Sequence, residues 1–372
     1  MIYLYIVKSC GYKKIYRFIY KQIKEDKMFE YPNELYNIFE KLDNLNAKPI
    51  IVGGFVRDTI LGIKSKDIDI EVYNVSSYEI LFEILKEFGH PNIVGKSFGI
   101  LKLSLNGLEI DFSLPRKDTK TSKGHKGFIV QIDKNLSFED AAKRRDFTIN
   151  AIGYDPLKNL FLDPFEGKKD LQNKILKAVD SKTFVQDPLR VLRGVVFCAR
   201  FDLEMDEELK KLSSVMIEKN MLEELPKERI FQEIIKLLKR SKRPSVAFEI
   251  LKNISQNRYF DIQKNEFEEF LKLVDEIVVI KPNKNILNKL TNIIIGILYN
   301  TTPLKSLKTV IKDITDPKPL LMGRDLIDIG LKPSKKFSLI LQKLYQAQLE
   351  GRFNTKEDAK RYLISQNIHF SF

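Results

Sequence analysis

Few residues of the chain can serve a histidine- or cysteine-based site. Among 372 residues there are three histidines, two cysteines and no tryptophan. The histidines are too few for a histidine-based metal site, and they exclude an HD-type phosphohydrolase module. Cys10 and Cys198 lie far apart in sequence, so no disulfide framework is expected, and this usage is typical of a reducing compartment. The sequence therefore predicts a cytoplasmic protein.

Long apolar stretches are also absent. No run approaches the ~20 apolar residues that span a bilayer, so no membrane association is expected. The apolar start, residues 1–7, lacks the basic lead and the small-residue cleavage site of a signal peptide. Residues 1–27 carry no interpretable pattern. We treat them as an N-terminal extension whose place in the natural protein is open, with Met28 as a candidate start.

Basic residues exceed acidic ones by 63 to 50, which gives a formal net charge of +13. Two explanations stay open: lysine serves as a generic surface residue, or the protein binds a polyanion such as a nucleic acid. The hydrophobic fraction of 43% is that of an ordinary globular protein, and the length allows two to four packed units.

The most informative stretch begins with a double glycine. Residues 49–52 are apolar and predict a strand, and Gly53-Gly54 follow where the chain must turn. Without side chains, these residues let a polyphosphate approach backbone N–H groups closely. Arg57 lies in a short helix that we predict from Phe55 to Leu61, closed by Gly62.

Two aspartates, Asp67 and Asp69, follow on a second predicted strand. Residues i and i+2 of a strand point to the same side, so the two carboxylates face one space and repel each other. A divalent cation is the natural occupant, and paired metals are the usual device for in-line attack at phosphorus. The alternative is a solvated acidic strand, but the glycine turn before it favours a site.

A third carboxylate, Asp111, lies in a predicted β-hairpin. Residues 100–105 and 108–114 are strand-like, and Asn106-Gly107 suits a two-residue turn. A sheet can bring Asp111 beside the first two aspartates, where carboxylate trios hold metals and activate a hydroxyl. Taken alone, Asp111 is more simply a solvent-facing strand residue.

Residues 116–137 are polar, rich in lysine and without strong periodicity. This composition predicts a mobile loop, and such loops often close over a substrate. The alternative is a surface excursion without a function.

Residues 141–151 combine arginines, an acid and an asparagine with apolar anchors. Arg144 and Arg145 are suited to grip phosphate oxygens, and Asp146 and Asn150 to hold a ribose hydroxyl. A plain surface helix would more often use lysine and glutamate, so this density indicates a site. The turn at 163–167 then breaks the chain, and we place the first domain boundary there.

From about Leu171 onward the pattern is helical. One helix starts with Asp187 at an N-cap-like position and Pro188 in its first turn, so Asp187 and Arg190 share one face. These two residues form either a cap with a local ion pair or an acceptor and donor that match the edge of a base. A later helix begins at Glu228-Arg229, which can brace this pair or merely cap.

These motifs together resemble the class II tRNA nucleotidyltransferases, the CCA-adding enzymes, and their bacterial poly(A) polymerase relatives in the DNA polymerase β-like superfamily. They agree in order and spacing over residues 49–235, with a weaker likeness at 323–351. The resemblance implies an α+β nucleotidyltransferase head with a small mixed or antiparallel sheet, followed by an all-α C-terminal region. We assign residues 28–165 to the head, 166–235 to a neck of base-reading helices, and 236–372 to a helical, tRNA-binding body and tail.

The resemblance also implies a role for each motif. The protein would add C, C and A to the 3′ end of tRNA from CTP and ATP, with Mg²⁺ and without a template; no protein partner is implied. Asp67, Asp69 and Asp111 would be catalytic, with the metal on Asp67 and Asp69. Residues 163–167 would form a flexible head–neck joint, and Glu228 and Arg229 would support the base reader, Asp187 and Arg190. The nucleotide would be bound by Gly53, Gly54, Arg57, Arg144, Arg145, Asp146, Asn150, Asp187, Arg190 and Arg193.

The family pattern is not matched at every position. The base reader begins Gln186-Asp187 where the family usually has Glu-Asp, and we expect base selection to survive. Poly(A) polymerase relatives carry a more basic version of the segment around 93–100, from which Ser97 and Lys102 depart, so CCA addition is favoured over a poly(A) polymerase. Two further functions stay open: an enzyme that adds only CC or only A, and a non-catalytic RNA-binding protein.

Overall fold

The computed structural model describes residues 29, 31–65, 67–94, 99–120, 128–256, 258–315, 318–333, 337–350, 352–353 and 355–365. The chain divides into two compact units at the junction of Tyr259 and Phe260. The predicted N-terminal extension, residues 1–27, lies outside the described residues. None of the described helices has both the length and the apolar character needed to cross a bilayer.

A seven-stranded mixed sheet is central to the first unit. Its strand order is β3-β4-β5-β2-β1-β8-β9, in which β2 and β5 run parallel and the other neighbours are antiparallel. The predicted α+β head with a small mixed sheet is therefore confirmed. The strands are β1 (Lys48–Val52), β2 (Asp67–Tyr73), β3 (Asn92–Val94), β4 (Ile100–Leu105), β5 (Leu108–Ser113), β8 (Gly153–Asp155) and β9 (Leu160–Leu162).

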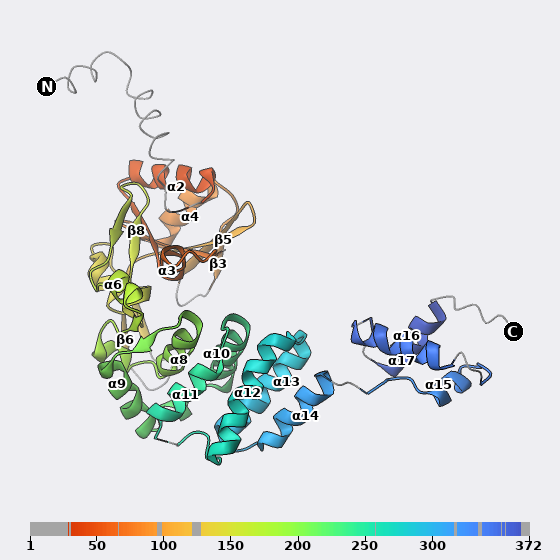
Figure 1. The fold of residues 1–372 in the computed structure, drawn as a ribbon. Coiled ribbons are helices and arrows are strands. Elements are labelled where there is room, and N and C mark those ends of the chain that lie inside the picture. Colours follow the sequence, from red (N-terminus) through yellow and green to blue (C-terminus); the bar gives the residue numbers. More distant parts are fainter. Residues whose placement is uncertain are drawn as a thin grey trace, which may run out of the picture. The chain divides into compact units, whose positions relative to one another are not determined.

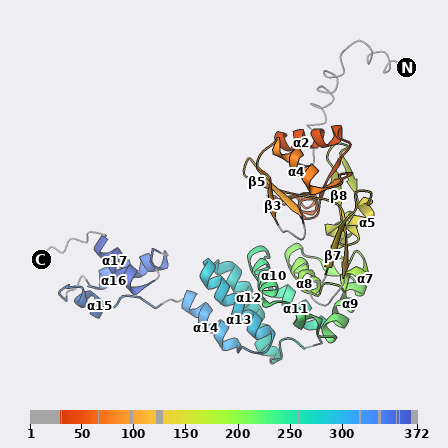
Figure 2. The ribbon, with the colours of Figure 1, turned by 180° about the vertical axis from the view of Figure 1, so that it is seen from behind.

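Helices α2 (Asn33–Asn44), α3 (Gly54–Ile60) and α4 (Tyr78–Lys86) pack against this sheet. The apolar residues of α2 recur at helical spacing, and Leu35, Ile38 and Phe39 are buried. Ser77 caps α4, because its hydroxyl accepts a hydrogen bond from the N–H of Ile80. Figures 1 and 2 show α2 and α4 together on one side of the sheet.

The β4–β5 hairpin has the predicted two-residue turn. Asn106 and Gly107 both have positive φ angles, 50° and 79°, as a type I′ turn requires. This turn pairs Lys102 with Asp111, and the parallel pairing of β2 with β5 places Asp69 opposite Asp111. The sheet thus brings Asp111 to the strand of the first two aspartates, as expected.

The mobile loop predicted for residues 116–137 is not what the structure contains. Two antiparallel strands, β6 (Arg116–Lys120) and β7 (Phe128–Ile132), occupy much of the segment. The prediction is wrong because a two-stranded ribbon pairs backbone groups and does not need the alternating apolar pattern of a strand that lies on a core. Residues 121–127 lie outside the described part of the chain.

The rest of the first unit is built around α8. This helix buries Val191, Leu192 and Val195 and packs against α10 and α11 (Figure 1). A short parallel pair, β10 with β11, interrupts the helices. The elements are α5 (Phe138–Ala142), η3 (Thr148–Asn150), α6 (Gly167–Gln172), β10 (Ile175–Leu176), α7 (Ser181–Phe184), α8 (Leu189–Phe201), β11 (Glu204–Met205), α9 (Glu207–Glu218), η4 (Met221–Glu224), α10 (Lys227–Arg240) and α11 (Ser245–Ile254).

All the described secondary-structure elements of the second unit are helices. The region that follows the head is thus mostly helical, as predicted, with the short β10–β11 pair as the exception to the all-α expectation. Phe260, Phe267 and Phe270 pack together in one core, and Leu326 and Leu344 belong to a second. The domain limits predicted at residues 165 and 235 lie within the first unit and stay predictions. The helices are α12 (Lys264–Ile280), α13 (Lys284–Leu298), α14 (Leu304–Thr315), α15 (Gly323–Asp328), α16 (Phe337–Leu349) and α17 (Lys356–Ser365).

Candidate functional site

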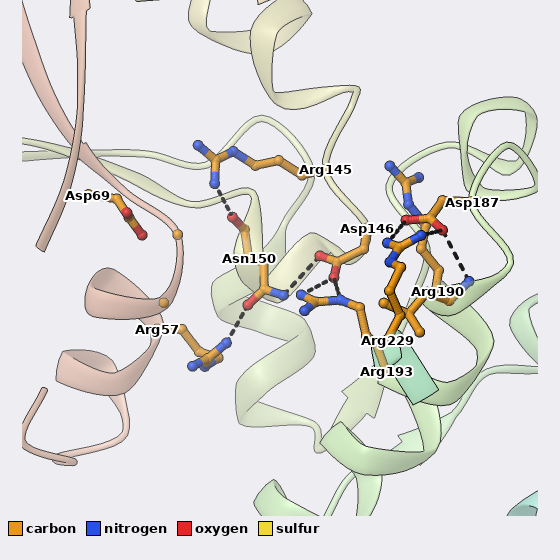
Figure 3. Close-up of a pocket in the computed structure, with 12 residues that line it drawn as sticks. Arg57, Asp69, Arg145, Asp146, Asn150, Asp187, Arg190, Arg193 and Arg229 are labelled. Atoms are coloured by element: carbon orange, nitrogen blue, oxygen red, sulfur yellow. Dashed lines mark hydrogen bonds and ion pairs between the residues drawn. The ribbon is translucent and has the colours of Figure 1, made fainter. Parts of the chain in front are cut away.

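A polar pocket of about 420 Å³ lies in the first unit, and residues from both the sheet region and the α8 region line it (Figure 3). All of its lining residues except Leu189 are predicted above from the sequence. Asp67, Asp111, Arg144 and Glu228 are predicted site residues that do not line it. The lining residues are Gly53, Gly54, Arg57, Asp69, Arg145, Asp146, Asn150, Asp187, Leu189, Arg190, Arg193 and Arg229.

Gly53 forms the turn between β1 and α3. Its φ of 73° and ψ of −133° lie in a region that side chains disfavour. A Cβ atom at this position would stand 3.1 Å from Nη1 of Arg145 and 3.7 Å from Oδ2 of Asp69. The turn therefore needs glycine for its backbone angles, and it places open backbone between an arginine and a carboxylate.

The carboxylate of Asp69 carries poorly compensated negative charge. The side chain reaches solvent but is seated among protein atoms, and this poor hydration raises its pKa. Arg145 opposes that shift, whereas the charges of Asp111, Asp67 and Glu71 add to it. A bound cation would relieve this repulsion.

The residues at this end of the pocket fit a divalent cation whose remaining coordination positions are filled by a bound ligand. Asp67 and Asp69 share one face of β2, and Mg²⁺ is commonly held by one or two carboxylates together with substrate phosphates. Within the described residues, no group of three or more histidine, cysteine, aspartate or glutamate side chains converges on one point. The described residues thus do not form a metal site in which every ligand comes from the protein.

Asp111 is already engaged in an ion pair. Nζ of Lys102 lies 2.6 Å from one carboxylate oxygen of Asp111 and 2.8 Å from the other. Our sequence reasoning missed this contact, although a signal exists: Lys102 and Asp111 are equally far from the Asn106-Gly107 turn, so the hairpin register predicts their pairing.

Glu71 holds the two arginines of the 141–151 motif. Its carboxylate is buried, and Oε1 accepts hydrogen bonds from Arg144 and, at 3.2 Å, from Nη2 of Arg145. Tyr73 donates to Oε2 at 2.9 Å. Burial alone raises the pKa of Glu71, but Arg145 and Arg144 outweigh it and hold that pKa below its ordinary value. Glu71 was missed in the sequence, although it continues the face of Asp67 and Asp69.

We expect replacement of Glu71 by alanine to lower the free energy of unfolding by about 3–5 kcal/mol, because it leaves two arginines without their buried partner. Chemical denaturation monitored by circular dichroism measures the change. Glu109→Ala is the matched control, since Glu109 is exposed on a neighbouring strand, and its effect should stay within about 0.5 kcal/mol. Equal effects of the two substitutions would contradict the anchoring role.

Asp146 joins this motif to α8. Its Oδ1 accepts hydrogen bonds from Nδ2 of Asn150 and the N–H of Phe147, both at 2.9 Å, and Nε of Arg193 donates to Oδ2 at 2.7 Å. Burial alone raises the pKa of Asp146, but Arg193 and Asn150 bring it below its ordinary value. The predicted ribose contacts of Asp146 and Asn150 stay predictions; here the two side chains bind each other.

Arg57 forms part of the wall between α3 and α8 rather than an open phosphate grip. Its Nε donates to Oδ1 of Asp58 at 2.8 Å, and its Nη1 donates to Oδ1 of Asn150. The guanidinium also lies over the rings of Phe197 and Phe201, 5.2 and 4.5 Å from their centroids. The aromatic partners were missed, because nothing local in the sequence links α3 to α8. A direct phosphate contact by Arg57 stays a prediction.

The far end of the pocket holds the predicted base reader. The guanidinium of Arg229 binds both carboxylate oxygens of Asp187, at 3.1 and 3.0 Å, and its supporting role stays a prediction. Nη2 of Arg190 donates to the carbonyl of Arg144 at 2.5 Å, and its Nη1 is buried with no hydrogen-bond partner in the described structure. A buried donor without a partner calls for an explanation, and Arg190 is among the residues that line the pocket. Gln186 does not line the pocket.

The segment proposed as a flexible joint is a hydrogen-bonded turn. The carboxylate of Asp163 accepts from the N–H groups of Gly167 and Lys168, at 2.7 and 2.9 Å. A Cβ atom on Gly167 would collide with the carbonyl oxygen of Thr148, so glycine allows the close packing of α6. Its role as a hinge stays a prediction.

Comparison with known families identifies the head. Residues 50–177 match the poly A polymerase head domain family, and this range holds the glycine turn, the three aspartates and the 141–151 motif. The resemblance inferred from the motifs is thereby confirmed for this part of the chain.

Curated relatives extend the likeness beyond the head. The multifunctional CCA protein of Methylobacillus flagellatus is 39% identical over 202 residues, 54% of this chain and 46% of that protein. The CCA-adding enzyme of Francisella tularensis is 34% identical over 214 residues, 55% of this chain and 54% of that protein. The chain is thus matched to about half the length of these relatives.

Solved structures show the same fold along most of the chain. A CCA-adding enzyme in complex with CTP aligns with a TM-score of 0.58 and 21% identity, covering 92% of this chain and 96% of that one. The Thermotoga maritima CCA-adding enzyme in complex with tRNA aligns with a TM-score of 0.57 and 22% identity, covering 90% and 95%. At this identity the likeness is one of fold.

Proposed function

We propose that the protein adds C, C and A to the 3′ end of tRNA from CTP and ATP without a nucleic-acid template. One observation carries the proposal: a single pocket has Asp69 and the Gly53 turn at one end, and Asp187 with Arg190 at the other (Figure 3). A nucleoside triphosphate needs phosphate and base contacts at once, and this pocket offers both. The relatives named CCA-adding enzyme and multifunctional CCA protein support the choice of reaction.

At the phosphate end, the chain supplies carboxylates and one anchored arginine. Asp67 and Asp69 would hold Mg²⁺, which when bound neutralises the triphosphate and lowers the pKa of the attacking 3′ hydroxyl. Arg145, fixed by Glu71 above the Gly53 turn, is placed to grip phosphate oxygens. The hydroxyl attacks the α-phosphate in line: its oxygen bonds to the α-phosphorus as the bond to the β-phosphate breaks, and pyrophosphate leaves. Asp111 is the candidate acceptor for the proton of the hydroxyl.

At the base end, the chain supplies fixed donors and acceptors. Arg229 fixes the carboxylate of Asp187, and Arg190 offers its unpaired Nη1. Such a site rejects a base whose edge leaves buried polar groups without partners. In this way, the side chains would take the place of a template.

The helical second unit is proposed to bind the acceptor arm of tRNA. The net charge of +13 suits a polyanionic partner, and contacts to phosphates depend on salt and read shape more than sequence. A cytoplasmic location is proposed together with this substrate.

The decisive experiment uses three tRNA transcripts, ending at the discriminator base, at C and at CC, each with Mg²⁺ and one nucleotide at a time. We expect two C residues on the first, one C on the second and one A on the third. Long A tails would assign a poly(A) polymerase, and incorporation of only C or only A would assign a split-function enzyme. No incorporation, with tRNA binding retained, would leave an RNA-binding protein.

A further inference from the structure

A row of charged side chains crosses three neighbouring strands at the edge of the phosphate end. Asp69 on β2 is in register with Asp111 on β5, which is in turn in register with Lys102 on β4. Directly opposite residues on neighbouring strands project from the same face of a sheet. The row therefore places one ammonium group on the far side of the third carboxylate from the aspartate pair.

The ammonium of Lys102 binds the carboxylate of Asp111 through both oxygens, at 2.6 and 2.8 Å. The Lys102 and Asp111 side chains are 37% and 26% exposed, so the pair is partly withdrawn from water yet open to exchange. A cation that bridged Asp111 to its neighbours would need one of these oxygens. Lys102 thus competes with a metal in two ways, by occupying the oxygens and by repelling positive charge.

We propose that Lys102 is a resident counter-ion that withholds Asp111 from the divalent-cation site and thereby sets the affinity of that site. In the nucleotide-free protein, the cation would then be held by Asp67 and Asp69 alone. The absence of any three-carboxylate cluster among the described residues agrees with this arrangement. The inference rests on the proposed function, because it takes Asp67 and Asp69 as the cation ligands.

Titration of Mn²⁺ into the full-length, nucleotide-free protein, followed by calorimetry and by the electron paramagnetic resonance signal of free Mn²⁺, tests the proposal. Lys102→Met should lower the dissociation constant about tenfold, since cation affinity follows the number and charge of the available ligands. Lys102→Gln, which also removes the charge, should shift it in the same direction. Lys41→Met is the matched control, because Lys41 is similarly exposed (36%) and pairs with Glu87 at 2.9 Å.

A double variant tests whether Lys102 acts on the cation affinity through Asp111. Lys102→Met combined with Asp111→Asn should return the affinity to that of the wild type, because the released carboxylate is gone. An unchanged dissociation constant in Lys102→Met, or a gain that survives Asp111→Asn, would overturn the proposal and leave the proposed function intact. No Mn²⁺ binding by the wild type would overturn both, with Asp69→Asn as the reference for a lost site.

Discussion

Replacement of Asp69 by asparagine is expected to lower the rate of nucleotide addition by about a thousandfold or more, while tRNA binding persists. The amide removes one charge from the only pocket-lining carboxylate on β2, among the described residues, and would weaken the proposed binding of a divalent cation. Metal stabilisation of the transition state amounts to several kcal/mol, and each ~1.4 kcal/mol is a factor of ten in rate. A structural role alone would not produce so large a loss.

Single-turnover addition of labelled CTP to a tRNA that lacks its CCA end measures the rate, and filter binding measures the affinity for tRNA. Glu40→Gln is the matched control, because it makes the same carboxylate-to-amide change at an exposed position of helix α2 that does not line the pocket. The control should keep its rate within about twofold. Loss of tRNA binding together with activity in Asp69→Asn would mean that the strand carrying Asp69 has been misassigned.

The local parts of this site could be predicted because their signals are local. Glycine is needed at position 53 because the turn there requires a positive φ angle. Asp67 and Asp69 share one face of β2 because side chains alternate along a strand. The Asn106-Gly107 turn fixes a hairpin register, and that register carries Asp111 to its place. In each case, a few consecutive residues contain the whole of the physical reason.

The partners of these residues could not be predicted, because they depend on how distant elements pack. Glu71 meets Arg144 and Arg145 only because β2 and the 141–151 motif lie side by side in the folded head. Arg57 meets Phe197 only because α8 packs near α3. The β6–β7 ribbon was missed for another reason: backbone pairing stabilises it, and its composition resembles that of a loop.

These distant contacts change how the site is understood. Four side chains that were each predicted to touch the nucleotide are joined to one another by a continuous series of hydrogen bonds: Arg57, Asn150, Asp146 and Arg193. This hydrogen-bonded series runs from α3 to α8 and connects the phosphate end of the pocket to the base end (Figure 3). A substitution at one end of the pocket is therefore expected to alter the side-chain positions at the other end.

Loss of the Arg190 side chain should impair the selection of the base without weakening the binding of tRNA. Arg190→Ala should lower the preference for CTP over UTP by about 10- to 100-fold, because a good pair of hydrogen bonds to a base edge contributes about 1–3 kcal/mol of discrimination. The ratio of kcat/KM for the two nucleotides, on a tRNA that ends at the discriminator base, gives this preference. The dissociation constant for tRNA should stay within about twofold.

Arg190→Lys distinguishes geometry from charge. Lysine keeps the positive charge but lacks the planar fork, in which one nitrogen donates to the carbonyl of Arg144 and the other is buried without a partner. If the fork reads the base, Arg190→Lys should lose discrimination nearly as fully as Arg190→Ala. If only the charge matters, Arg190→Lys should discriminate like the wild type. An unchanged CTP-to-UTP ratio in Arg190→Ala, at any overall rate, would remove Arg190 from the base reader and leave Asp187, held by Arg229, as the group that faces the base.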